Sequence, residues 1–162
     1  MAGAKSAGHL LLVVQKSICN IPSILLKIVV MKFPKVTVKR SIAGLGLFAA
    51  EDIRPDTIVI EYTGERITTE EGDRRGGKYL FTLDEHWIID GKDRSNISRY
   101  INHSCDPNCE AEIDEEEEKI YIRATTYIKK GEEITYDYGK EYWLEHCQPC
   151  RCTKCTKAKK KK

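Results

Sequence analysis

Residues 99–109 read RYINHSCDPNC, and this short stretch decides the fold of the chain. It places two cysteines, a histidine, a proline and several other polar side chains within eleven residues. Burying such groups costs free energy unless each one finds a hydrogen-bond partner. Because the neighbouring residues are typical of a core, we expect the segment to be buried and fully hydrogen-bonded. The alternative is a turn-rich loop that happens to contain a histidine and cysteines able to bind metal.

Three further segments occur in the order found in one known family. With residues 99–109, the segments 41–49 (SIAGLGLFA), 61–65 (EYTGE) and 133–139 (EITYDYG) resemble the four motifs of the SET-domain protein-lysine N-methyltransferases. The match spans residues 36–155, which is most of the chain. The resemblance implies a SET domain followed by a post-SET segment, and no cysteine-rich pre-SET segment precedes the match in this sequence.

Most of the chain between these motifs predicts short β-strands separated by turns. Two hairpins are expected, one around residues 84–86 and one around the acidic run 114–118. The sequence therefore predicts a mainly β domain of small sheets. The resemblance implies the SET β-clip fold, in which the signature segment and the closing motif meet in a knot-like crossing above a short zinc-binding tail. The expected strands are residues 36–38, 57–62, 79–83, 87–89, 111–113, 119–123 and 133–136, with one short helix at 68–75.

The composition is that of one modest globular domain. The chain has 162 residues, 32% of them charged, and a formal net charge of +2, which is too small to indicate nucleic-acid binding by itself. The charge is unevenly placed, because no acidic residue precedes Glu51 and the chain is basic from Lys154 onward. We expect residues 157–162 to be disordered, with nuclear targeting or weak nucleic-acid binding as the alternative for this basic tail.

Residues 1–33 differ in character from the rest and are expected to form an N-terminal extension that is disordered or dispensable. Their apolar stretch contains Lys16 and Lys27, and each lysine would cost about 2.5–3.5 kcal/mol inside a bilayer. We therefore expect no membrane span, while an organelle-targeting segment remains an alternative. Residues 34–139 are expected to form the SET domain, and residues 140–162 the post-SET segment with its basic tail.

The pattern Gly44-x-Gly46-x-x-Ala49 formally satisfies a dinucleotide-binding fingerprint. That fingerprint needs a helix opening at the glycines, and Pro55 leaves no room for a full crossover helix. Two interpretations stay open. The glycines serve a tight bend, or their missing side chains let the backbone approach a ligand closely. The resemblance implies that Gly44, Leu45 and Gly46 contact S-adenosyl-L-methionine.

The pair Asn102-His103 offers both hydrogen-bond donors and acceptors. With the adjoining backbone, these groups would suit a methionine carboxylate and an adenine edge, although a structural role for the pair is the alternative. The resemblance places both residues at the cofactor. It also implies cofactor contacts for Tyr79 and, more weakly, for Arg151, which lies between two cysteines.

Tyr138 carries the main mechanistic hypothesis. A lysine amine must be neutral to attack a methyl group, yet its unperturbed pKa is about 10.4. Burial in an apolar channel beside a cationic sulfonium lowers that pKa. The resemblance places Tyr138 where the amine would meet the methyl group. Because a phenol has a pKa of about 10, Tyr138 is better suited to orient the reactants than to act as a general base.

Three further aromatic residues are candidates for the lysine channel: Tyr62, Phe81 and Tyr136, with Tyr62 and Tyr136 also counted as catalytic. The alternative for each is ordinary core packing. In the family, tyrosine at the position of Tyr136 tends to limit the product to monomethyllysine, because its hydroxyl, or a water that it holds, fills the space of a second methyl group. We therefore expect mainly monomethylation.

The chain contains seven cysteines, and four of them (Cys147, Cys150, Cys152 and Cys155) fall within nine residues. Such clustering indicates metal binding in a reducing compartment rather than a disulfide framework. The resemblance implies a structural zinc held by Cys105, Cys150, Cys152 and Cys155. The spacing Cys-x-Cys-x2-Cys is two residues shorter than the usual family spacing. A local cluster in which Cys147 replaces Cys105, or free thiols without metal, therefore remain alternatives.

Together these features predict an S-adenosyl-L-methionine-dependent protein-lysine methyltransferase. Its partner would be a lysine-containing, histone-like or other basic protein, and we expect an intracellular monomer in the cytoplasm or bound to chromatin in the nucleus. One alternative is a catalytically silent SET-fold binding module, which loss of Tyr138, Asn102 or Gly46 would have favoured, yet all three are present. The other is a zinc-dependent nucleic-acid-binding protein.

Overall fold

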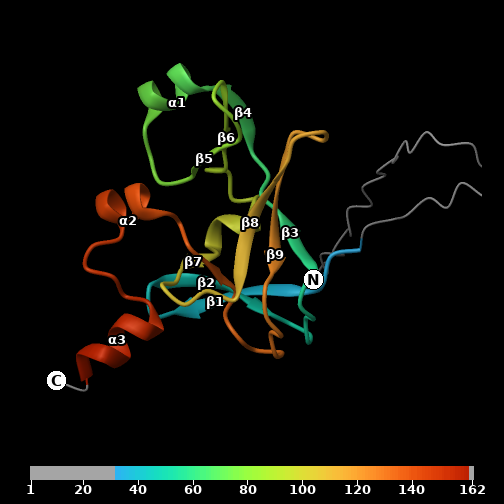
Figure 1. The fold of residues 1–162 in the computed structure, drawn as a ribbon, viewed down its shortest axis with the longest axis vertical. Coiled ribbons are helices and arrows are strands. Elements are labelled where there is room, and N and C mark those ends of the chain that lie inside the picture. The colour runs from blue at the N-terminus through green and yellow to red at the C-terminus, as the bar shows by residue number, and fades with distance from the viewer. Residues whose placement is uncertain (1–31, 161–162) are drawn as a thin grey trace, which may run out of the picture. The chain divides into compact units, whose positions relative to one another are not determined.

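The structure is a computed structural model that describes residues 32–160. Within this range, no helix is long and apolar enough to cross a membrane. The expected N-terminal extension lies almost wholly outside the described residues. The elements, labelled in Figure 1, are β1 (Val36–Ser41), β2 (Gly44–Ala49), β3 (Ile58–Glu61), β4 (Glu65–Thr68), α1 (Thr69–Arg75), β5 (Leu80–Thr82), β6 (Trp87–Asp90), the 3-10 helix η1 (Ile97–Tyr100), β7 (Asn102–His103), β8 (Cys109–Asp114), β9 (Lys119–Ala124), β10 (Thr135–Tyr136), α2 (Lys140–His146) and α3 (Thr153–Lys160).

The strands form four small sheets in the described part of the chain. Strands β1 and β2 make an antiparallel pair, β3-β9-β8 and β4-β6-β5 make three-stranded sheets, and β10 pairs with β7. In Figure 1, α1 lies with the β4-β6-β5 sheet at the top, and α2 and α3 lie on the left. The prediction of a mainly β domain of small sheets is confirmed. Both hairpins are also confirmed, since β5 pairs with β6 and β8 pairs with β9.

The signature segment and the closing motif lie side by side, as the resemblance implied. Strands β7 and β10 pair in parallel, with Asn102 opposite Thr135 and His103 opposite Tyr136. The backbone N–H of Ser104 donates to the carbonyl of Tyr136 at 3.1 Å. This parallel contact joins two segments that are far apart in sequence, and it places the polar residues of both motifs around one region of the molecule.

Asn108 fastens the closing motif to the signature segment. Its Nδ2 donates to the Glu133 carbonyl at 2.9 Å, and its Oδ1 accepts the backbone N–H of Thr135 at 2.9 Å. The amide therefore satisfies two backbone groups that have no strand partner on that side. Asn108 therefore stabilises the crossing, because without its side chain both backbone groups would lose their hydrogen bonds.

We expect Asn108→Ala to lower the free energy of unfolding by about 2–3 kcal/mol, because two backbone groups lose their partners. Urea denaturation at neutral pH measures this change. Asp106→Ala, at an exposed residue of the same loop, is the matched control and should change stability by less than about 0.5 kcal/mol. Equal effects of the two substitutions would contradict the role given to Asn108.

The signature segment is less uniform than expected. Ile101, Ser104 and Cys109 are buried, but Asp106 is exposed. The Nε of Arg99 is buried, and no partner for it lies among residues 32–160. The prediction of a fully hydrogen-bonded segment was therefore wrong for Arg99. Its guanidinium instead stacks on the Tyr79 ring, with Cζ 3.9 Å from the ring centre. This contact uses the flat face of the guanidinium and leaves the Nε proton without an acceptor in the part of the chain that the structure describes.

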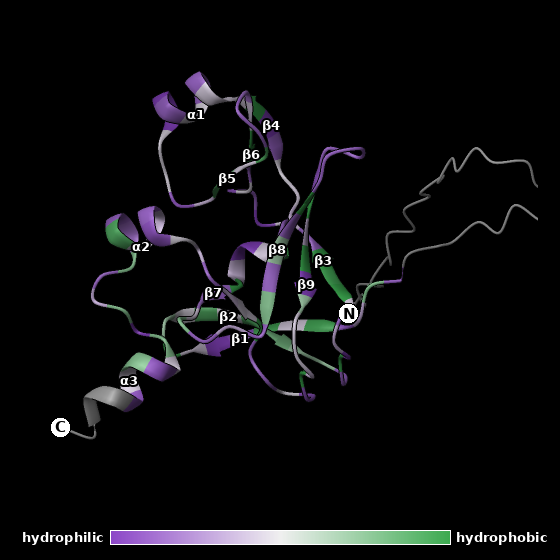
Figure 2. Ribbon diagram, in the orientation of Figure 1, coloured by the Kyte–Doolittle hydropathy of each residue, from purple (hydrophilic) through white to green (hydrophobic). Residues whose placement is uncertain are grey.

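The main core is formed by branched aliphatic residues of β2, β3, β9 and the connections between them. These strands are among the most hydrophobic parts of Figure 2, whereas α1 is hydrophilic. Burying each such side chain stabilises the fold by about 1.5–3 kcal/mol. The signature segment contributes two residues to this core, Ile101 and Cys109, and these anchor the segment in the interior. The core members with almost no exposure are Leu47, Ile53, Val59, Ile101, Ile122, Ile128 and Ile134.

The helix expected at residues 68–75 is present as α1. Thr68 caps its first turn by accepting the N–H of Glu71 at 3.2 Å, which satisfies one of the free amides there. At the other end, Arg75 makes ion pairs with Glu65 on β4 and with Asp90, a buried residue on β6. These pairs fasten the helix to its sheet.

Some elements were not predicted, and one prediction was wrong. Strand β4 and helices η1 and α2 had no strong pattern, and β10 is shorter than the expected strand 133–136. Residues 157–160 were expected to be disordered, yet α3 continues to Lys160. The helix begins beside Cys152, whose carbonyl accepts the N–H of Thr156 at 2.9 Å. Anchoring at the cysteines, together with the good helix propensity of lysine, explains the order.

Candidate active site

A cavity of about 900 Å³ lies where β5, η1, β7, β10 and α2 meet, and aromatic side chains form much of its wall. Ring centroids are 5.3 Å apart for Tyr62 and Phe81, 6.1 Å for Phe81 and Tyr136, and 4.8 Å for Tyr136 and Tyr138. These separations are typical of packed aromatic pairs. Seven of the predicted site residues line this cavity: Leu45, Tyr62, Tyr79, Phe81, Asn102, Tyr136 and Tyr138.

Tyr138 is held from both ends. Its hydroxyl donates to the carbonyl of Ile101 at 2.6 Å, and its backbone N–H donates to Nδ1 of His103 at 3.3 Å. Burial, followed by the neighbouring phenol of Tyr142, raises the pKa of Tyr138 well above its ordinary value. Tyr138 is therefore neutral at physiological pH. Because its proton is committed to Ile101, its oxygen can offer lone pairs to a group in the cavity.

Tyr62 and Tyr136 differ in how their hydroxyls are used. The hydroxyl of Tyr62 donates to the backbone carbonyl of Tyr79 at 2.9 Å. Gly91 packs so closely against this hydroxyl that a Cβ at position 91 would lie 2.5 Å from it. Tyr136 is only 9% exposed and lines the cavity. In the described part of the chain, its hydroxyl has no hydrogen-bond partner. Burial raises the pKa of both phenols, so both are neutral.

Tyr142 on α2 completes the aromatic wall and was missed by the sequence reasoning. Its ring meets Tyr138 edge to face, with centroids 5.1 Å apart, and its hydroxyl donates to the Lys78 carbonyl at 2.7 Å. Burial raises the pKa of Tyr142 to about 12. The available signal was its place shortly after the closing motif, and in the structure Tyr142 lies in the first turn of α2 and lines the cavity.

Four of the eight predicted cofactor contacts line a second cavity of about 340 Å³, and Gly44, Leu45, Gly46 and Tyr79 do not. Asn102 and Tyr138 line both this cavity and the larger one. His103 and Arg151 line the second cavity, next to Cys150 and Cys152. The two cavities therefore share part of their walls, in which Asn102 and Tyr138 are the predicted site residues and Ala43, Lys78, His146 and Cys147 are the others.

The two glycines of the Gly-x-Gly motif are required for different reasons. Gly44 has a φ of +124°, a conformation that side-chain-bearing residues rarely adopt, and it begins β2 directly after the turn at residues 42–43. Gly46 has no such strain. A Cβ there would overlap the Oε1 of Glu133 and lie 2.9 Å from the Ser41 Cβ. In this structure the space left by the missing side chain holds the carboxylate of Glu133, and neither glycine lines the two cavities.

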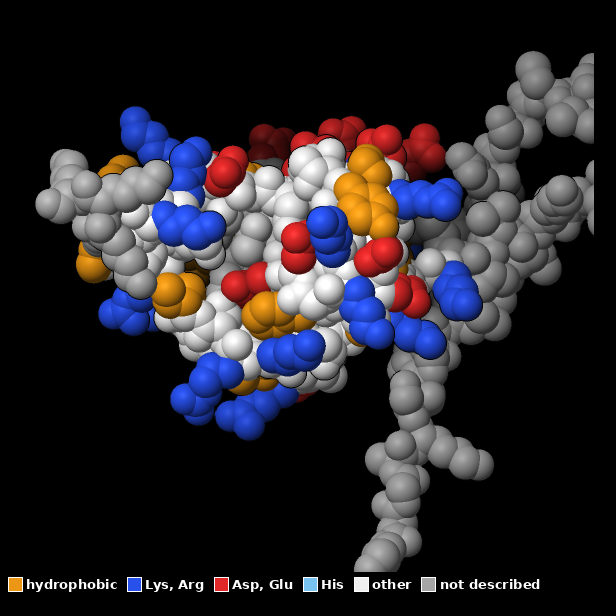
Figure 3. All heavy atoms as spheres, turned by 90° about the horizontal axis from the view of Figure 1, so that it is seen from below, with side chains coloured by type: hydrophobic (Ala, Val, Ile, Leu, Met, Phe, Trp, Pro, Cys, Tyr) orange, Lys and Arg blue, Asp and Glu red, His pale blue; other side chains and the backbone are white. Residues whose placement is uncertain are grey.

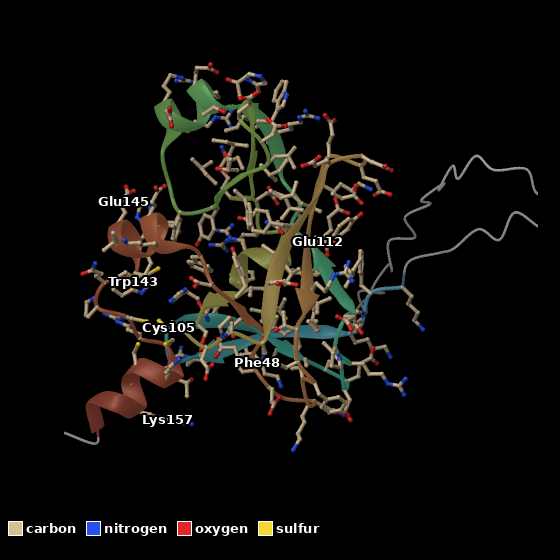
Figure 4. The ribbon with its side chains drawn as sticks, viewed as in Figure 1. Phe48, Cys105, Glu112, Trp143, Glu145 and Lys157 are labelled. Atoms are coloured by element: carbon tan, nitrogen blue, oxygen red, sulfur yellow. The ribbon has the colours of Figure 1, made fainter. Side chains whose placement is uncertain are left out.

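The structure brings together four cysteines from two distant parts of the chain. The sulfurs of Cys105, Cys150, Cys152 and Cys155 all lie within 4.8 Å of one another. Cys105 Sγ is 3.8 Å from the sulfurs of both Cys150 and Cys155. Figure 4 labels Cys105 near the start of α3, and Lys154 Nζ donates to its carbonyl at 3.2 Å. Cys147 is not part of this group.

This group of four thiols fits zinc. Four thiolates at about 2.3 Å from a tetrahedral zinc lie about 3.8 Å apart. The thiols are also unequal, since burial raises the pKa of Cys105 to about 12. Burial alone would raise the pKa of Cys152 too, but backbone N–H groups and neighbouring thiols lower it to about 6. Four adjacent thiolates would repel one another, so a divalent cation would stabilise their deprotonated forms.

His103 links the cysteine group to Tyr138. Its Nε2 lies 3.3 Å from Cys105 Sγ, and its Nδ1 accepts the backbone N–H of Tyr138. Both ring nitrogens are therefore occupied by protein contacts, so a contact between His103 and a cofactor would use its backbone or the face of its ring.

The face of the molecule seen in Figure 3 carries charges of both signs. On the face seen in Figure 3, lysine and arginine side chains are interspersed with aspartate and glutamate. Phosphate binding needs several basic groups along one continuous track. The face in Figure 3 therefore offers no such track for the nucleic-acid alternative.

The small sheets, the parallel β7-β10 contact, and the cavity beside four cysteines together define the class of fold that the motifs implied. The family model described as "SET domain" matches residues 44–139, more than half of the chain. The chain therefore belongs to the SET-domain family.

Named relatives agree with this assignment. The chain is 46% identical over 126 residues to "Histone-lysine N-methyltransferase set-2" of Caenorhabditis elegans, covering 69% of this chain and 8% of the relative. It is 43% identical over 122 residues to "Histone-lysine N-methyltransferase 2D" of Homo sapiens, covering 68% of this chain and 2% of the relative. The chain thus spans less than a tenth of the length of these curated relatives.

A solved structure described as "Crystal structure of an active polycomb repressive complex 2 in the stimulated state" has the same fold. It superposes with a TM-score of 0.63 at 41% identity, covering 67% of this chain and 16% of that one.

Proposed function

We propose that the chain is a protein-lysine N-methyltransferase that uses S-adenosyl-L-methionine and acts on a basic, histone-like protein. The observation that carries this proposal is the position of Tyr138, whose ring lies at the meeting point of an aromatic cavity and a second, more polar cavity. A methyl transfer between two substrates needs such a junction. The names of the relatives support the lysine side chain as the acceptor.

In this proposal the second cavity holds the methyl donor and the aromatic cavity holds the lysine. When bound, the donor supplies a methyl carbon activated by a sulfonium. Asn102, His103 and Arg151 line that second cavity and are proposed donor contacts. Leu45 and Tyr79, which line the aromatic cavity, and Gly44 and Gly46, which line neither cavity, are proposed as donor contacts from the family resemblance alone.

The aromatic wall would act on the lysine in two ways. Tyr62, Phe81 and Tyr136 exclude water around the lysine side chain, and desolvation lowers the pKa of the amine, so that more of it is neutral. Their flat rings also restrict where the amine can lie. The hydroxyl of Tyr138 would then orient the reacting groups through its oxygen lone pairs. Fixing reactants in this way can supply several kcal/mol of the barrier reduction.

The proposed product is mainly monomethyllysine, because the hydroxyl of Tyr136 occupies the cavity without a protein partner. We expect Tyr136→Phe to raise the ratio of dimethylated to monomethylated product by about tenfold or more, the usual scale for one methyl group in a tight pocket. Mass spectrometry of a methylated histone peptide measures this ratio. Tyr127→Phe is the matched control, since Tyr127 is exposed and its hydroxyl contacts Asp52 at the surface. An unchanged product distribution in Tyr136→Phe would contradict the proposal.

The cysteine group would hold a structural zinc and keep α3 beside the second cavity. We further propose a nuclear, chromatin-associated location, by analogy with relatives named for histone substrates. That the chain is a monomer stays a prediction. So do the domain limits at residues 34–139 and 140–162.

The direct test is methyl transfer. The purified, zinc-loaded chain is incubated with radiolabelled S-adenosyl-L-methionine and a mixture of histones, and labelled lysines are located by mass spectrometry. Transfer to lysine would support the proposal. Donor binding without transfer to any protein would favour a silent SET-fold module instead. Binding to DNA that weakens steeply with salt and survives Tyr138→Phe would favour the nucleic-acid alternative.

A further inference from the structure

Glu133 belongs to the closing motif but contacts neither the aromatic wall nor the cysteine group. Its carboxylate lies at the centre of a small polar network. Ser41 Oγ donates to its Oε2 at 2.8 Å, and Asn102 Nδ2 donates to its Oε1 at 2.7 Å. The missing Cβ of Gly46 leaves the space in which this carboxylate lies. Three of the four family motifs therefore meet at one side chain, which lines neither of the two cavities above but borders a third cavity of about 380 Å³ together with Ser41 and Asn102.

This network decides which way the Asn102 amide points. Its Nδ2 donates both to Glu133 and to the backbone carbonyl of Leu45, at 3.1 Å. Both neighbours are pure acceptors, so the amide cannot be flipped without placing oxygen against oxygen. The amide nitrogen of Asn102 makes both contacts, so its carbonyl oxygen stays available to accept a hydrogen bond. Asn102 lines both cavities, and no donor reaches its Oδ1 within the described range of the chain.

The chemistry of the ligand group opposite Asn102 follows from this orientation. A carbonyl oxygen accepts hydrogen bonds, so it cannot bind the carboxylate of a methionine moiety, as the sequence alone had allowed. It requires a donor. A carboxylate behind the amide also polarises it and makes its oxygen a better acceptor, which favours a cationic donor over a neutral hydroxyl. In the methyl donor the cation with hydrogen-bonding protons is the α-ammonium group.

We propose that Glu133 is a positioning residue, which holds the Asn102 amide so that its oxygen accepts a hydrogen bond from the α-ammonium group of the methyl donor. The inference rests on the proposed function. It assigns Asn102 to one group of that ligand. It also explains why residue 46 is glycine, since any side chain there would displace the Glu133 carboxylate.

The test is a thermodynamic cycle with two ligands, measured by isothermal titration calorimetry. One is S-adenosylhomocysteine, and the other is its deaminated analogue, which keeps the carboxylate but lacks the ammonium. Glu133→Ala should weaken binding of S-adenosylhomocysteine about tenfold, as expected for a hydrogen bond to a charged group. Binding of the deaminated analogue should weaken by less than about twofold, since that ligand never makes the contact.

Two further variants separate positioning from other causes. Glu133→Gln keeps an oxygen for Asn102 and can donate to Ser41 Oγ, so its affinity should stay within about threefold of wild type. Glu132→Ala removes the neighbouring exposed carboxylate and is the matched control. If Glu133→Ala fails to fold, Ser41→Ala frees the other carboxylate oxygen and should give the same selective loss, with a smaller size.

The outcomes are distinct. Equal losses for the two ligands would overturn the positioning role of Glu133. A loss in Glu133→Gln as large as that in Glu133→Ala would also overturn it, because glutamine can still hold the Asn102 amide and positioning would then not account for the loss. If the wild-type chain bound neither ligand, the proposed function would fall, and this inference with it.

Discussion

Tyr138→Phe is expected to lower the rate of methyl transfer by about 10²- to 10³-fold, the scale found when one oriented polar group is removed from an active site. The ring would remain, and with it the packing against Tyr136 and Tyr142. The lost atom is the oxygen that the carbonyl of Ile101 holds in place at 2.6 Å. The loss should therefore fall on kcat, while the affinity for the methyl donor changes little.

The measurement combines single-turnover transfer to a histone peptide with calorimetric binding of S-adenosylhomocysteine. Tyr127→Phe again serves as control, because it removes a tyrosine hydroxyl far from the cavity. The variant leaves the Ile101 carbonyl without its partner, so a fall in stability of about 1 kcal/mol is also expected. A rate reduced by less than threefold would show that Tyr138 only packs the wall, and the proposed mechanism would have to be abandoned.

Removal of zinc is the second change with a large expected effect. Cys105→Ser, or treatment with a strong chelator, should abolish tight zinc binding, because the remaining three thiols cannot complete the tetrahedron. Since Cys105 is the only one of the four grouped cysteines that lies before residue 140, its loss should detach residues 147–160 from the rest of the fold. Transfer activity should then fall at least about 100-fold, because Arg151 and the other post-SET residues no longer line the second cavity.

Zinc content by mass spectrometry and limited proteolysis of the tail are the readouts. Cys147→Ser is the informative comparison, since Cys147 lies in the same segment but outside the group of four sulfurs. It should retain about one zinc per chain, whereas Cys105→Ser should retain almost none. The reverse pattern would establish the purely local cluster that the shortened cysteine spacing left open.

Much of the fold could be predicted from the sequence because its signals are local. The strand runs on either side of residues 84–86 and 114–118 alternate around turn residues, and both formed hairpins. The helix α1 carries its own cap in Thr68. The tail after Lys157 was misjudged because its composition is typical of disorder, whereas its helix begins at the cysteines.

The site divides in the same way. Tyr62, Phe81, Tyr136 and Tyr138 belong to motifs or hydrophobic strands, so their types and places were visible. Tyr142 and Glu133 were given no role from the sequence. Tyr142 belongs to none of the four motifs, and Glu133 opens the closing motif but its residue type alone indicates no partner. Their roles come from what they touch across the fold: Lys78 and Tyr138 for the first, and Ser41 and Asn102 for the second.

By itself, the sequence determined the family, the mainly β character and the set of aromatic and sulfur groups available for chemistry. These properties follow from side-chain type and short-range spacing. Only the tertiary structure decided which groups meet: Cys105 with the tail cysteines, Tyr138 with Ile101, and Glu133 with Asn102. Those meetings depend on the parallel pairing of β7 with β10. Such a long-range contact is stabilised by the whole packed core rather than by any local pattern.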